Sequence, residues 1–364
     1  MVWWQLYLFV FVMASVFSLV FTPLFEKIAR LTNFLDRPDQ HTHNRHEKPT
    51  PVLGGVAMFL AWIATITVCL LAAFSSQSIR LNADVNNALP GIPLISSRLL
   101  FLCLGAFLIT MVGFVDDHYR LKASTKFIGQ LAVAVLAVWL GGIRVTVFIH
   151  SEIVSWAASI FWILLIINAI NFLDNMDGLA AGISFISMAL LTTVAIISGQ
   201  HFVAALGAAG AGSIIGFWFF NHAPASIFMG DSGSHFLGYT LAILSVSATY
   251  YIPNVSSTHL TMLIPLFILA IPLFDAVAVV LIRLYLHKPI YIGDHNHISH
   301  RFVHMGMDKK RAVLLVHLLS FVIGIGVLPL MWGDVKTAVV IVAQALAFLL
   351  IITILQFSVV DNHD

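Results

Sequence analysis

A series of long apolar segments constrains the fold of this chain more than any other feature. About 20 consecutive apolar residues form a helix long enough to cross the roughly 30 Å hydrocarbon core of a bilayer. A window of that length finds eleven segments: 3–25, 53–75, 98–115, 127–142, 153–172, 179–198, 202–220, 235–252, 259–283, 312–332 and 336–358. The sequence therefore predicts an all-α, polytopic membrane protein with about eleven transmembrane helices. The fourth segment has the weakest support, because it is short and ends in two glycines.

Composition agrees with this class and leaves little room for a soluble domain. Hydrophobic residues make up 60% of the 364 residues, charged residues 10%, and the mean hydropathy is +0.96. A water-soluble core has no reason to reach such values. Cys69 and Cys103 both lie in apolar segments, so we interpret them as small buried hydrophobic residues rather than a disulfide. We expect one transmembrane domain over residues 1–364.

The distribution of Lys and Arg predicts the orientation. The first segment has no basic residue ahead of it and is followed by Lys27 and Arg30, which indicates a retained helix rather than a signal peptide. With the 26–52 loop in the cytoplasm, 14 of the 18 Lys and Arg residues lie inside. The remaining four are Arg80, Arg98, Arg144 and Lys336. We predict an outside N-terminus, a cytoplasmic C-terminus, and cytoplasmic active-site loops at about 26–52, 116–126, 173–178, 221–234 and 284–311.

Five carboxylates fall at the predicted cytoplasmic ends of these segments: Asp116, Asp117, Asp174, Asp177 and Asp231. Carboxylates at the edge of a bilayer are costly to desolvate, so several at one depth indicate a cation and a phosphorylated ligand. Asp116 and Asp117 end the third segment, where adjacent acids repel each other and oppose the helix dipole. A bound cation or proton would relieve both effects. The alternative is two solvated acids at a helix end.

Two amides and two acids repeat at a spacing of three around the end of the fifth segment. They are Asn168, Asn171, Asp174 and Asp177, in Asn168-Ala-Ile-Asn-Phe-Leu-Asp-Asn-Met-Asp-Gly178. This spacing predicts one polar stripe. As an alternative, Asp177 caps the helix that begins at Gly178.

The stretch from Asn221 to Ser234 predicts a loop, since it contains Pro224, Gly230 and Gly233. Glycines on both sides of Asp231 would let the backbone approach a phosphate while the carboxylate reaches Mg²⁺, which prefers oxygen ligands. Capping of the next helix is the competing role for Asp231.

Histidines gather in the last cytoplasmic loop, at His295, His297 and His300. No cysteine is nearby to complete a zinc site. Beside Lys288 and Arg301, they favour phosphate binding or acid–base chemistry. Earlier in the chain, His46 precedes Pro49-Thr-Pro51 and Gly54-Gly55. Asp275, inside the ninth segment, has two interpretations, a structural one and orientation of the histidine loop.

Together these motifs resemble the polyprenyl-phosphate N-acetylhexosamine-1-phosphate transferase family, which includes WecA, TagO and MraY. The resemblance covers nearly the whole chain. Its landmarks occur in family order: His46 to Gly55, Gly113-Phe-Val-Asp-Asp117, Asn168 to Gly178, Asn221 to Ser234, and the histidine loop.

The resemblance implies transfer of a sugar 1-phosphate from a UDP-N-acetylhexosamine to a polyprenyl phosphate, with release of UMP. It implies Mg²⁺, with Mn²⁺ as an alternative, in a multi-pass protein of the cell membrane whose site faces the cytoplasm. It also suggests a homodimer, and no nucleic acid is expected as a partner. N-acetylglucosamine is the leading donor sugar.

Residue roles carry over by similarity. Asp231 would bind the metal, and Asp116 or Asp117 would bind or deprotonate the lipid phosphate. Asp174 and Asp177 would help to hold the nucleotide sugar. Further substrate-binding residues are His46, Lys126, Asn168, Asn171, Asn221, His297, His300 and Arg301; Lys126 and Arg301 supply positive charge, and the histidines of the last loop contact phosphate or sugar.

Two departures from the family pattern concern the donor. Ser299 stands where many relatives have a histidine, and Val52 where an arginine is frequent. The consecutive histidines of the MraY pattern are absent, which disfavours a muramoyl-pentapeptide donor but keeps it as the rival within the enzyme class. An ion-coupled transporter is the main rival from another class. It is disfavoured because the two halves show no repeat and the acids lie at one edge. A non-catalytic lipid-binding scaffold is the third alternative.

Overall fold

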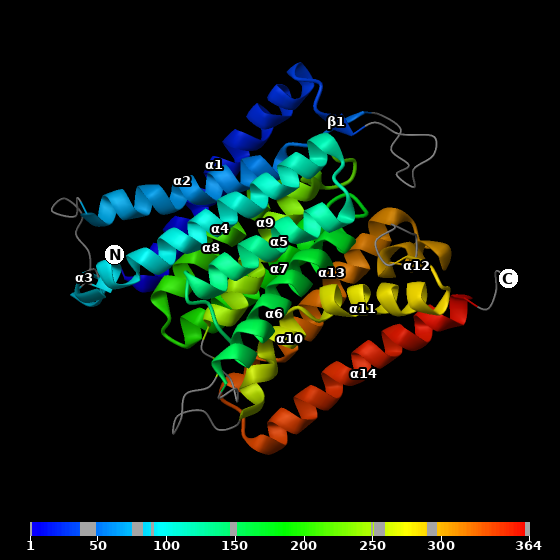
Figure 1. Ribbon diagram of the computed structural model, residues 1–364. Coiled ribbons are helices and arrows are strands. Elements are labelled where there is room, and N and C mark those ends of the chain that lie inside the picture. The colour runs from blue at the N-terminus through cyan, green and yellow to red at the C-terminus, as the bar shows by residue number, and fades with distance from the viewer. Residues whose placement is uncertain are drawn as a thin grey trace.

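Helices make up most of the protein (Figure 1). The structure is a computed structural model and describes residues 2–36, 49–74, 83–88, 91–145, 151–248, 250, 259–289 and 297–360. The α-helices are α1 (Trp3–Leu31), α2 (Gly54–Phe74), α3 (Ala83–Ala88), α4 (Ile92–Tyr119), α5 (Ala123–Trp139), α6 (Glu152–Leu173), α7 (Leu179–Ile197), α8 (His201–Asn221), α9 (Gly230–Ser247), α10 (Ile264–Ile268), α11 (Ala270–Tyr285), α12 (Ile298–His304), α13 (Lys309–Gly326) and α14 (Val335–Val360). Short 3₁₀ helices cover His259–Leu263 and Leu328–Met331. Two short strands, β1 (Leu35–Asp36) and β2 (Thr50–Pro51), pair antiparallel with Leu35 opposite Pro51.

Ten of the eleven predicted apolar segments fall mainly on one α-helix each, and 259–283 is divided among a 3₁₀ helix, α10 and α11. Within the described residues, eight helices are long and apolar enough to cross a membrane, and a ninth span results if the bent α10–α11 pair counts as one. α5 is apolar but has only 17 residues, and α9 is not among the eight. The protein is therefore a multi-pass, all-α membrane protein, while eleven crossings stay a prediction.

α9 lies in the centre of the bundle, and this position explains its polar composition. Its residues from Ser232 to Ser245 are all buried, and it packs against α2, α4 and α6. Several of its hydroxyls bond to carbonyls of the preceding turn, as Thr240 Oγ1 does to Phe236 O (2.9 Å), and Tyr239 OH donates to Leu102 O of α4. A helix shielded from lipid by its neighbours does not need a continuous apolar surface.

The chain bends by 68° between the segment that ends at Ile268 and α11. The sequence supplies the cause, since Pro272 has no N–H to donate to the carbonyl of Ile268 four residues earlier. Ser187 Oγ, on α7, donates to that carbonyl instead (3.2 Å). The break therefore leaves this buried acceptor satisfied and directs α11 toward the end of the bundle that carries α12 (Figure 1).

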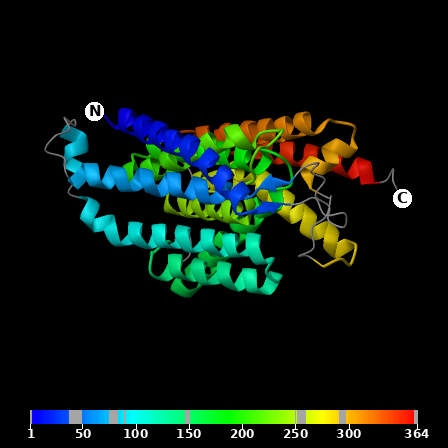
Figure 2. The same cartoon turned by 90° about the horizontal axis from the view of Figure 1, so that it is seen from above.

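The two ends of the bundle differ in content. The N-terminus lies beside α3 at one end, and the strands, α12 and the last turns of α14 lie at the other (Figures 1 and 2). The second end also carries the end of α4, the start of α5, the end of α6 and the start of α9. The predicted cytoplasmic motifs of the described residues therefore come from chain segments that meet at one end of the molecule.

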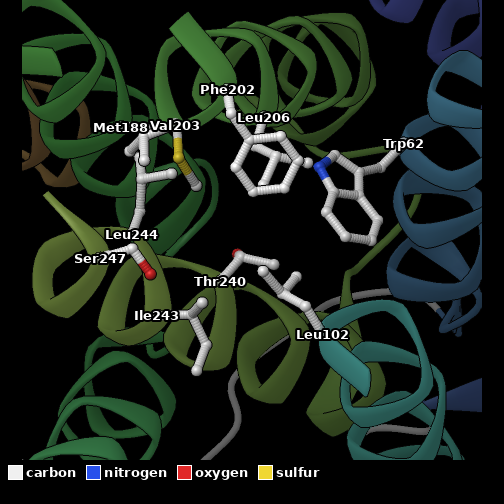
Figure 3. A pocket seen from close by; sticks show the side chains of 10 residues that line it. All are labelled: Trp62, Leu102, Met188, Phe202, Val203, Leu206, Thr240, Ile243, Leu244 and Ser247. Atoms are coloured by element: carbon white, nitrogen blue, oxygen red, sulfur yellow. The ribbon is translucent and has the colours of Figure 1, made fainter. Parts of the chain in front are cut away.

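A small cavity lies between α2, α4, α7, α8 and α9, away from that polar end (Figure 3). Its volume is about 20 Å³, and Trp62, Met188 and Thr240 are among its lining residues. Thr240 is nine residues along α9 from Asp231, which is about 13 Å at the rise of an α-helix. The cavity has room for about one water molecule, so it is too small for a sugar or an isoprenoid chain.

Candidate active site

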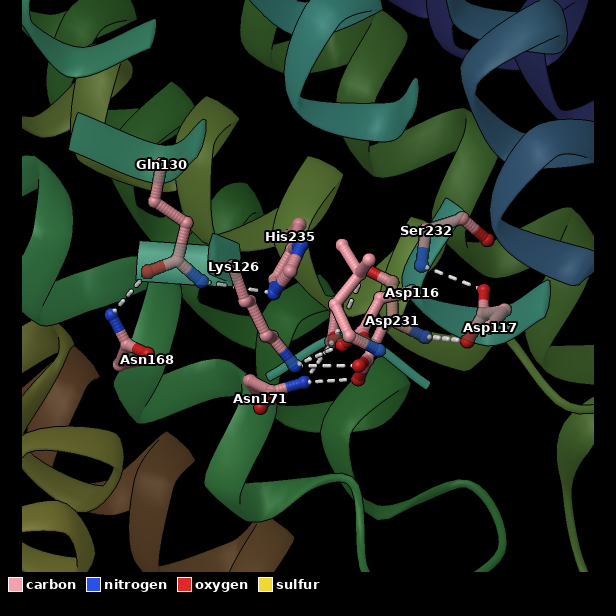
Figure 4. A network of polar contacts seen from close by, with 11 residues as sticks. Asp116, Asp117, Lys126, Gln130, Asn168, Asn171, Asp231, Ser232 and His235 are labelled. Atoms are coloured by element: carbon pink, nitrogen blue, oxygen red, sulfur yellow. Dashed lines mark hydrogen bonds and ion pairs between the residues drawn. The ribbon is translucent and has the colours of Figure 1, made fainter. Parts of the chain in front are cut away.

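The centre of the polar end is an ion cluster built on Lys126, in the first turn of α5 (Figure 4). Its Nζ lies 2.9 Å from Asp116 Oδ2 at the end of α4 and 2.5 Å from Asp231 Oδ2 at the start of α9. The Asp116 and Lys126 side chains are 9% and 17% exposed, and Asp231 is 29% exposed. One ammonium group thus joins two carboxylates that are 115 residues apart in the sequence, at a position open enough on the Asp231 side for a ligand.

Asn171, in the last turn of α6, also contacts the carboxylate of Asp231. Its Nδ2 donates to Asp231 Oδ1 (2.6 Å) and contacts Ser234 Oγ at 2.9 Å. Asp231 therefore has a cation on one oxygen and an amide donor on the other. These two contacts fix the direction of its carboxylate and lower the cost of holding a charge in a half-buried place.

The adjacent acids Asp116 and Asp117 have different tasks. Asp117 Oδ1 accepts from the backbone N–H of Asp231 (2.7 Å), and Asp117 Oδ2 accepts from that of Ser232 (3.0 Å). The side chain therefore caps the first turn of α9 from another helix, where N–H groups lack intrahelical partners and the dipole favours negative charge. Asp116 instead pairs with Lys126, and its Oδ1 accepts from Leu121 N (2.8 Å). Neither acid is simply solvated at the helix end.

Glycines let the backbones of α2, α4 and α9 meet at this cluster. A Cβ on Gly55 would overlap the backbone of Gly233, and one on Gly113 would overlap the carbonyl of Asp231. Gly230 has a positive φ of 64°, which directs the chain into α9 beside the carboxylate of Asp117. The glycines of the predicted motifs therefore set backbone distances, and these distances place Asp231 within reach of α4 and α5.

A second row of three polar side chains lies behind the ion cluster. Of these, only Asn168 was predicted from the sequence. Asn168 Nδ2 donates to Gln130 Oε1 (2.9 Å), so the Gln130 Nε2 amide donates to His235 Nε2 (3.0 Å). Gln130 and His235 are both buried. Each follows a cluster residue by four positions in its helix, Lys126 and Asp231 respectively, and that helical spacing is the signal that could have found them.

The acidic loop, residues 174–178, corrects part of the predicted stripe. α6 ends at Leu173, so Asp174 and Asp177 do not continue the helical face of Asn168 and Asn171. Asp177 Oδ2 accepts from Ala225 N (3.0 Å), which ties the acidic loop to the 222–229 loop. The suggested capping of α7 by Asp177 is wrong: Asn221 Oδ1 accepts from Gly178 N instead (3.1 Å).

Asp174 is the C-cap residue of α6, and its carboxyl lies near those of Asp231 and Asp177. Burial, and then the negative charges of Asp231 and Asp177, raise the pKa of Asp174 from its usual 3.8 to about 7. Asn221 has a structural explanation, since it also donates to Ile227 O (3.0 Å) and so holds the start of α7 to the loop before α9. The acidic loop and the loop that carries Asp231 are thus joined by both Asp177 and Asn221.

The histidine helix, α12 with its N-cap His297, packs on α13 and α14 and is reached by Asp275 of α11 and Phe172 of α6. His297 Nδ1 lies 2.7 Å from Asp275 Oδ2, and Ser299 Oγ donates to Asn175 Oδ1 (2.7 Å). The rings of His297 and His300 have centroids 6.4 Å apart, and Arg301 is buried. These predicted residues therefore lie at the same end as the ion cluster. His46 and His295 lie outside the described residues.

Comparison with known proteins gives the chain a family. The sequence pattern of glycosyl transferase family 4 matches residues 99–249. The chain is 32% identical, over 94% of its length and 88% of the relative, to a probable undecaprenyl-phosphate N-acetylglucosaminyl 1-phosphate transferase of Bacillus subtilis (strain 168). The protein belongs to glycosyl transferase family 4. The resemblance inferred from the motifs is thereby confirmed.

Two other family 4 relatives indicate the range of named activities. A decaprenyl-phosphate N-acetylglucosaminephosphotransferase of Mycobacterium leprae (strain TN) is 29% identical over 77% of the chain and 73% of the relative. A phospho-N-acetylmuramoyl-pentapeptide-transferase of Geobacillus thermodenitrificans (strain NG80-2) is 30% identical over 63% of the chain and 71% of the relative. The matched family region, 99–249, contains the whole ion cluster but not the histidine helix.

The family 4 site has donors that suit a hard divalent cation. No group of three His, Cys, Asp or Glu side chains is placed to hold a metal within the described residues. Mg²⁺, however, is commonly bound by one or two carboxylates together with substrate phosphates and water. Asp116 Oδ2 and Asp231 Oδ2 already converge on one cation, the Lys126 ammonium. An oxygen-only pair of this kind fits Mg²⁺ or Mn²⁺, and it gives no soft ligand that would favour zinc.

Proposed function

We propose that the protein transfers N-acetylglucosamine 1-phosphate from UDP-N-acetylglucosamine to undecaprenyl phosphate, giving undecaprenyl-diphosphate-N-acetylglucosamine and UMP. The observation that carries the proposal is the pairing of Lys126 with both Asp116 and Asp231 at one end of a membrane bundle. The activities named for the relatives support it, since the match to the Bacillus relative covers 94% of this chain. Initiation of a cell-envelope glycan is the corresponding role.

The reaction joins two anionic substrates, so the site must offset negative charge. An oxygen of the lipid phosphate attacks the phosphorus that carries the sugar, and the bond from that phosphorus to the UMP oxygen breaks. Lys126 supplies positive charge between Asp116 and Asp231, where the two phosphates would meet. Mg²⁺ bound at Asp231 and Asp116 would neutralise charge on the diphosphate and the departing UMP. Most of the catalysis then comes from positioning and electrostatics.

The two adjacent acids can be assigned separately. Asp117 uses both oxygens on backbone N–H groups of α9, and loss of those bonds would uncap the helix that presents Asp231. Asp116 pairs with the flexible side chain of Lys126, which can shift toward an incoming phosphate. We therefore assign Asp116 to the lipid phosphate, as the group that binds it or accepts its proton. Asp117 holds the site in place.

The donor side of the site is proposed at the acidic loop. Asn171 reaches Asp231 from α6, and Asp174 follows one turn later with a raised pKa. A carboxyl that titrates near neutrality can accept or donate a hydrogen bond to a sugar or ribose hydroxyl. Asp177 and Asn221 hold this loop against the one that leads into Asp231. The histidine helix lies on the far side of the same loop.

Transfer of labelled sugar phosphate into organic-extractable lipid tests the proposal. Purified protein with undecaprenyl phosphate and Mg²⁺ would receive labelled UDP-N-acetylglucosamine, UDP-N-acetylgalactosamine or UDP-N-acetylmuramoyl-pentapeptide, with UMP measured in parallel. Labelled lipid and stoichiometric UMP from the first donor are expected. Product from the pentapeptide donor alone would replace the proposal by its rival, the activity named for the Geobacillus relative. Folded protein that makes no product from any donor would refute transfer of these sugars.

We further propose that the polar end faces the cytoplasm of a cell membrane crossed eleven times. The excess of Lys and Arg in the loops of this end supports that orientation. With Cys69 and Cys103 replaced by alanine, single cysteines at Ser124 and Asp334 would report the two sides, since both positions are exposed. Asp334→Cys should react with an impermeant maleimide in intact cells and Ser124→Cys should not. The reverse pattern would overturn the orientation.

A further inference from the structure

The histidine helix carries His297 and His300 and lies near the edge of the bundle. α12 is seven residues long and packs mainly on α13 and α14, away from the ion cluster. Asp275 of α11 and Asn175 of the acidic loop are among the side chains that reach it on the side of the site. We propose that Asp275 and Ser299 are positioning residues, which hold the histidine helix against the acidic loop and direct His297 toward the nucleotide sugar. This inference rests on the proposed function for the identity of that ligand.

Asp275 contacts both the backbone and the side chain at the start of α12. Its Oδ1 accepts from the N–H of Ile298 (2.6 Å), and its Oδ2 lies 2.7 Å from His297 Nδ1. Asp275 is 1% exposed and His297 5%. A carboxylate oxygen can only accept, so His297 Nδ1 carries the proton. This arrangement fixes the tautomer of His297 and leaves Nε2 as the nitrogen for a ligand.

The ring of His297 is held on a second side by Phe172, at the end of α6. The two rings have centroids 6.3 Å apart and are nearly edge to face. The guanidinium of Arg283, on α11, lies 5.3 Å from the centroid of the same Phe172 ring. Phe172 is therefore shared by α11 and the N-cap of α12, and it is two residues before Asp174. The orientation of His297 is thus linked directly to the start of the acidic loop.

Ser299 gives the second connection, and it distinguishes this chain from the common family pattern. Ser299 is fully buried, and its hydroxyl donates to Asn175 Oδ1 (2.7 Å). Asn175 in turn donates from Nδ2 to Phe172 O (3.0 Å), which fixes its amide orientation. The serine therefore ties α12 to the acidic loop, whose neighbours Asp174 and Asp177 are the proposed donor-side residues.

The chemistry of Asp275 allows a variant that separates positioning from folding. In Asp275→Asn, the remaining oxygen can still accept from Ile298 N, but the amide NH₂ would face His297 Nδ1. The ring would have to carry its proton on Nε2 instead. We expect a melting temperature equal to that of the wild type and a kcat/KM about tenfold lower, the lower end of effects seen when the partner of a functional histidine is changed.

A double-mutant cycle then tests whether Asp275 acts through His297. Asp275→Asn should lower kcat/KM in the wild-type background and change it by less than twofold in a His297→Ala background. A further tenfold loss in the His297→Ala background would overturn the positioning role. So would wild-type kinetics in Asp275→Asn alone.

The Ser299 connection makes a prediction that differs between the two substrates. Ser299→Ala should raise the KM for UDP-N-acetylglucosamine about fivefold, the size expected for one neutral hydrogen bond, and leave the KM for undecaprenyl phosphate unchanged. Asn175→Ala should do the same, and Ser299→Ala/Asn175→Ala should be no worse than either single variant. Ser320→Ala, which alters a buried hydroxyl on α13 away from this contact, is the matched control. Equal KM changes for both substrates, or none, would overturn the inference.

Amide hydrogen exchange separates failure of this inference from failure of the proposed function, because it needs no substrate. Exchange over residues 298–304 should be faster in Asp275→Ala and Ser299→Ala than in the wild type and the Ser320→Ala control. Unchanged exchange would overturn the positioning roles. Faster exchange in protein that transfers no sugar phosphate would uphold the connection between α12 and the acidic loop, and would reject the proposed reaction alone.

Discussion

The starts of α9 and α12 are built on the same plan but are supported very differently. At each, an aspartate from another helix accepts from the first backbone N–H groups, Asp117 at α9 and Asp275 at α12. α9 then continues for 18 residues through the centre of the bundle, whereas α12 has seven residues near its edge. The same capping contact therefore starts a long central helix in one place and a short peripheral one in the other.

This difference suggests how the two halves of the site divide their tasks. Asp231 is presented by a helix that cannot move without displacing α2, α4 and α6. His297 is presented by a helix whose contacts with the site side are a few hydrogen bonds and one ring contact. Elements with few buried contacts open at lower free energy. The side with the phosphates is thus preorganised, and the histidine side can adjust to the nucleotide sugar.

The largest expected effect concerns the packing of α9. In Gly55→Ala, the new methyl group would overlap the backbone of Gly233, and a backbone cannot rotate away as a side chain does. The change should cost about 3 kcal/mol or more and sharply reduce the yield of monodisperse protein in detergent. Gly326→Ala is the control, since nothing lies within 4 Å of its added Cβ. Equal yields of the two variants would show that α9 is not packed more rigidly than α12.

The next effect concerns turnover rather than folding. Asp231→Asn removes the negative charge that faces Lys126. It keeps the shape of the side chain and its position beside Asn171. Turnover should fall at least about 1,000-fold, as is typical when a principal electrostatic contact to the transition state is lost. His297→Ala should cost less, about 100-fold. Steady-state rates of both variants are compared at unchanged folded yield. A larger loss for Asp231→Asn would support the proposed division of roles, and a larger loss for His297→Ala would reverse it.

A third effect concerns the capping aspartate of α9. Asp117→Ala would leave two backbone N–H groups of a half-buried helix start without their acceptor, so we expect a loss of about 2–3 kcal/mol in the free energy of unfolding. Asp308→Ala removes an exposed cap of α13, whose side chain accepts from Arg311 N, and should cost about 1 kcal/mol because water replaces it. Thermal unfolding in one detergent compares the two. A smaller loss for Asp117→Ala would contradict its role in holding α9.

The sequence predicted the positions of the helices well, because length and apolar content are local properties. It also brought the acids of three separate motifs to one end, since alternation of the segments fixes which ends meet. It could not assign different roles to Asp116 and Asp117. The side chains of adjacent helical residues point in different directions, and what each one meets depends on where α5 and α9 lie. For the same reason the partner of Asp177, Ala225 N, was missed, and a local helix cap was the alternative role considered for this residue. The helix break after Leu173 removed the predicted stripe.

The last expected effect concerns Asp174 and depends on pH. The pKa of this carboxyl is about 7 in the folded protein and near 3.8 when exposed, so the folded state binds its proton more tightly. The ionised form therefore opposes folding, and this cost is absent below pH 4, grows between pH 4 and 7, and is complete above pH 7. Asp174→Asn, without metal or substrate, should match the wild type near pH 4 and exceed its melting temperature by an amount that increases as the pH rises to 8. A constant difference across that range would mean that Asp174 is ionised throughout. In that case the negative charges of the acidic loop are stabilised as well as those at the start of α9. The contrast between a preorganised phosphate side and an adjustable donor side would then depend on the histidine helix alone.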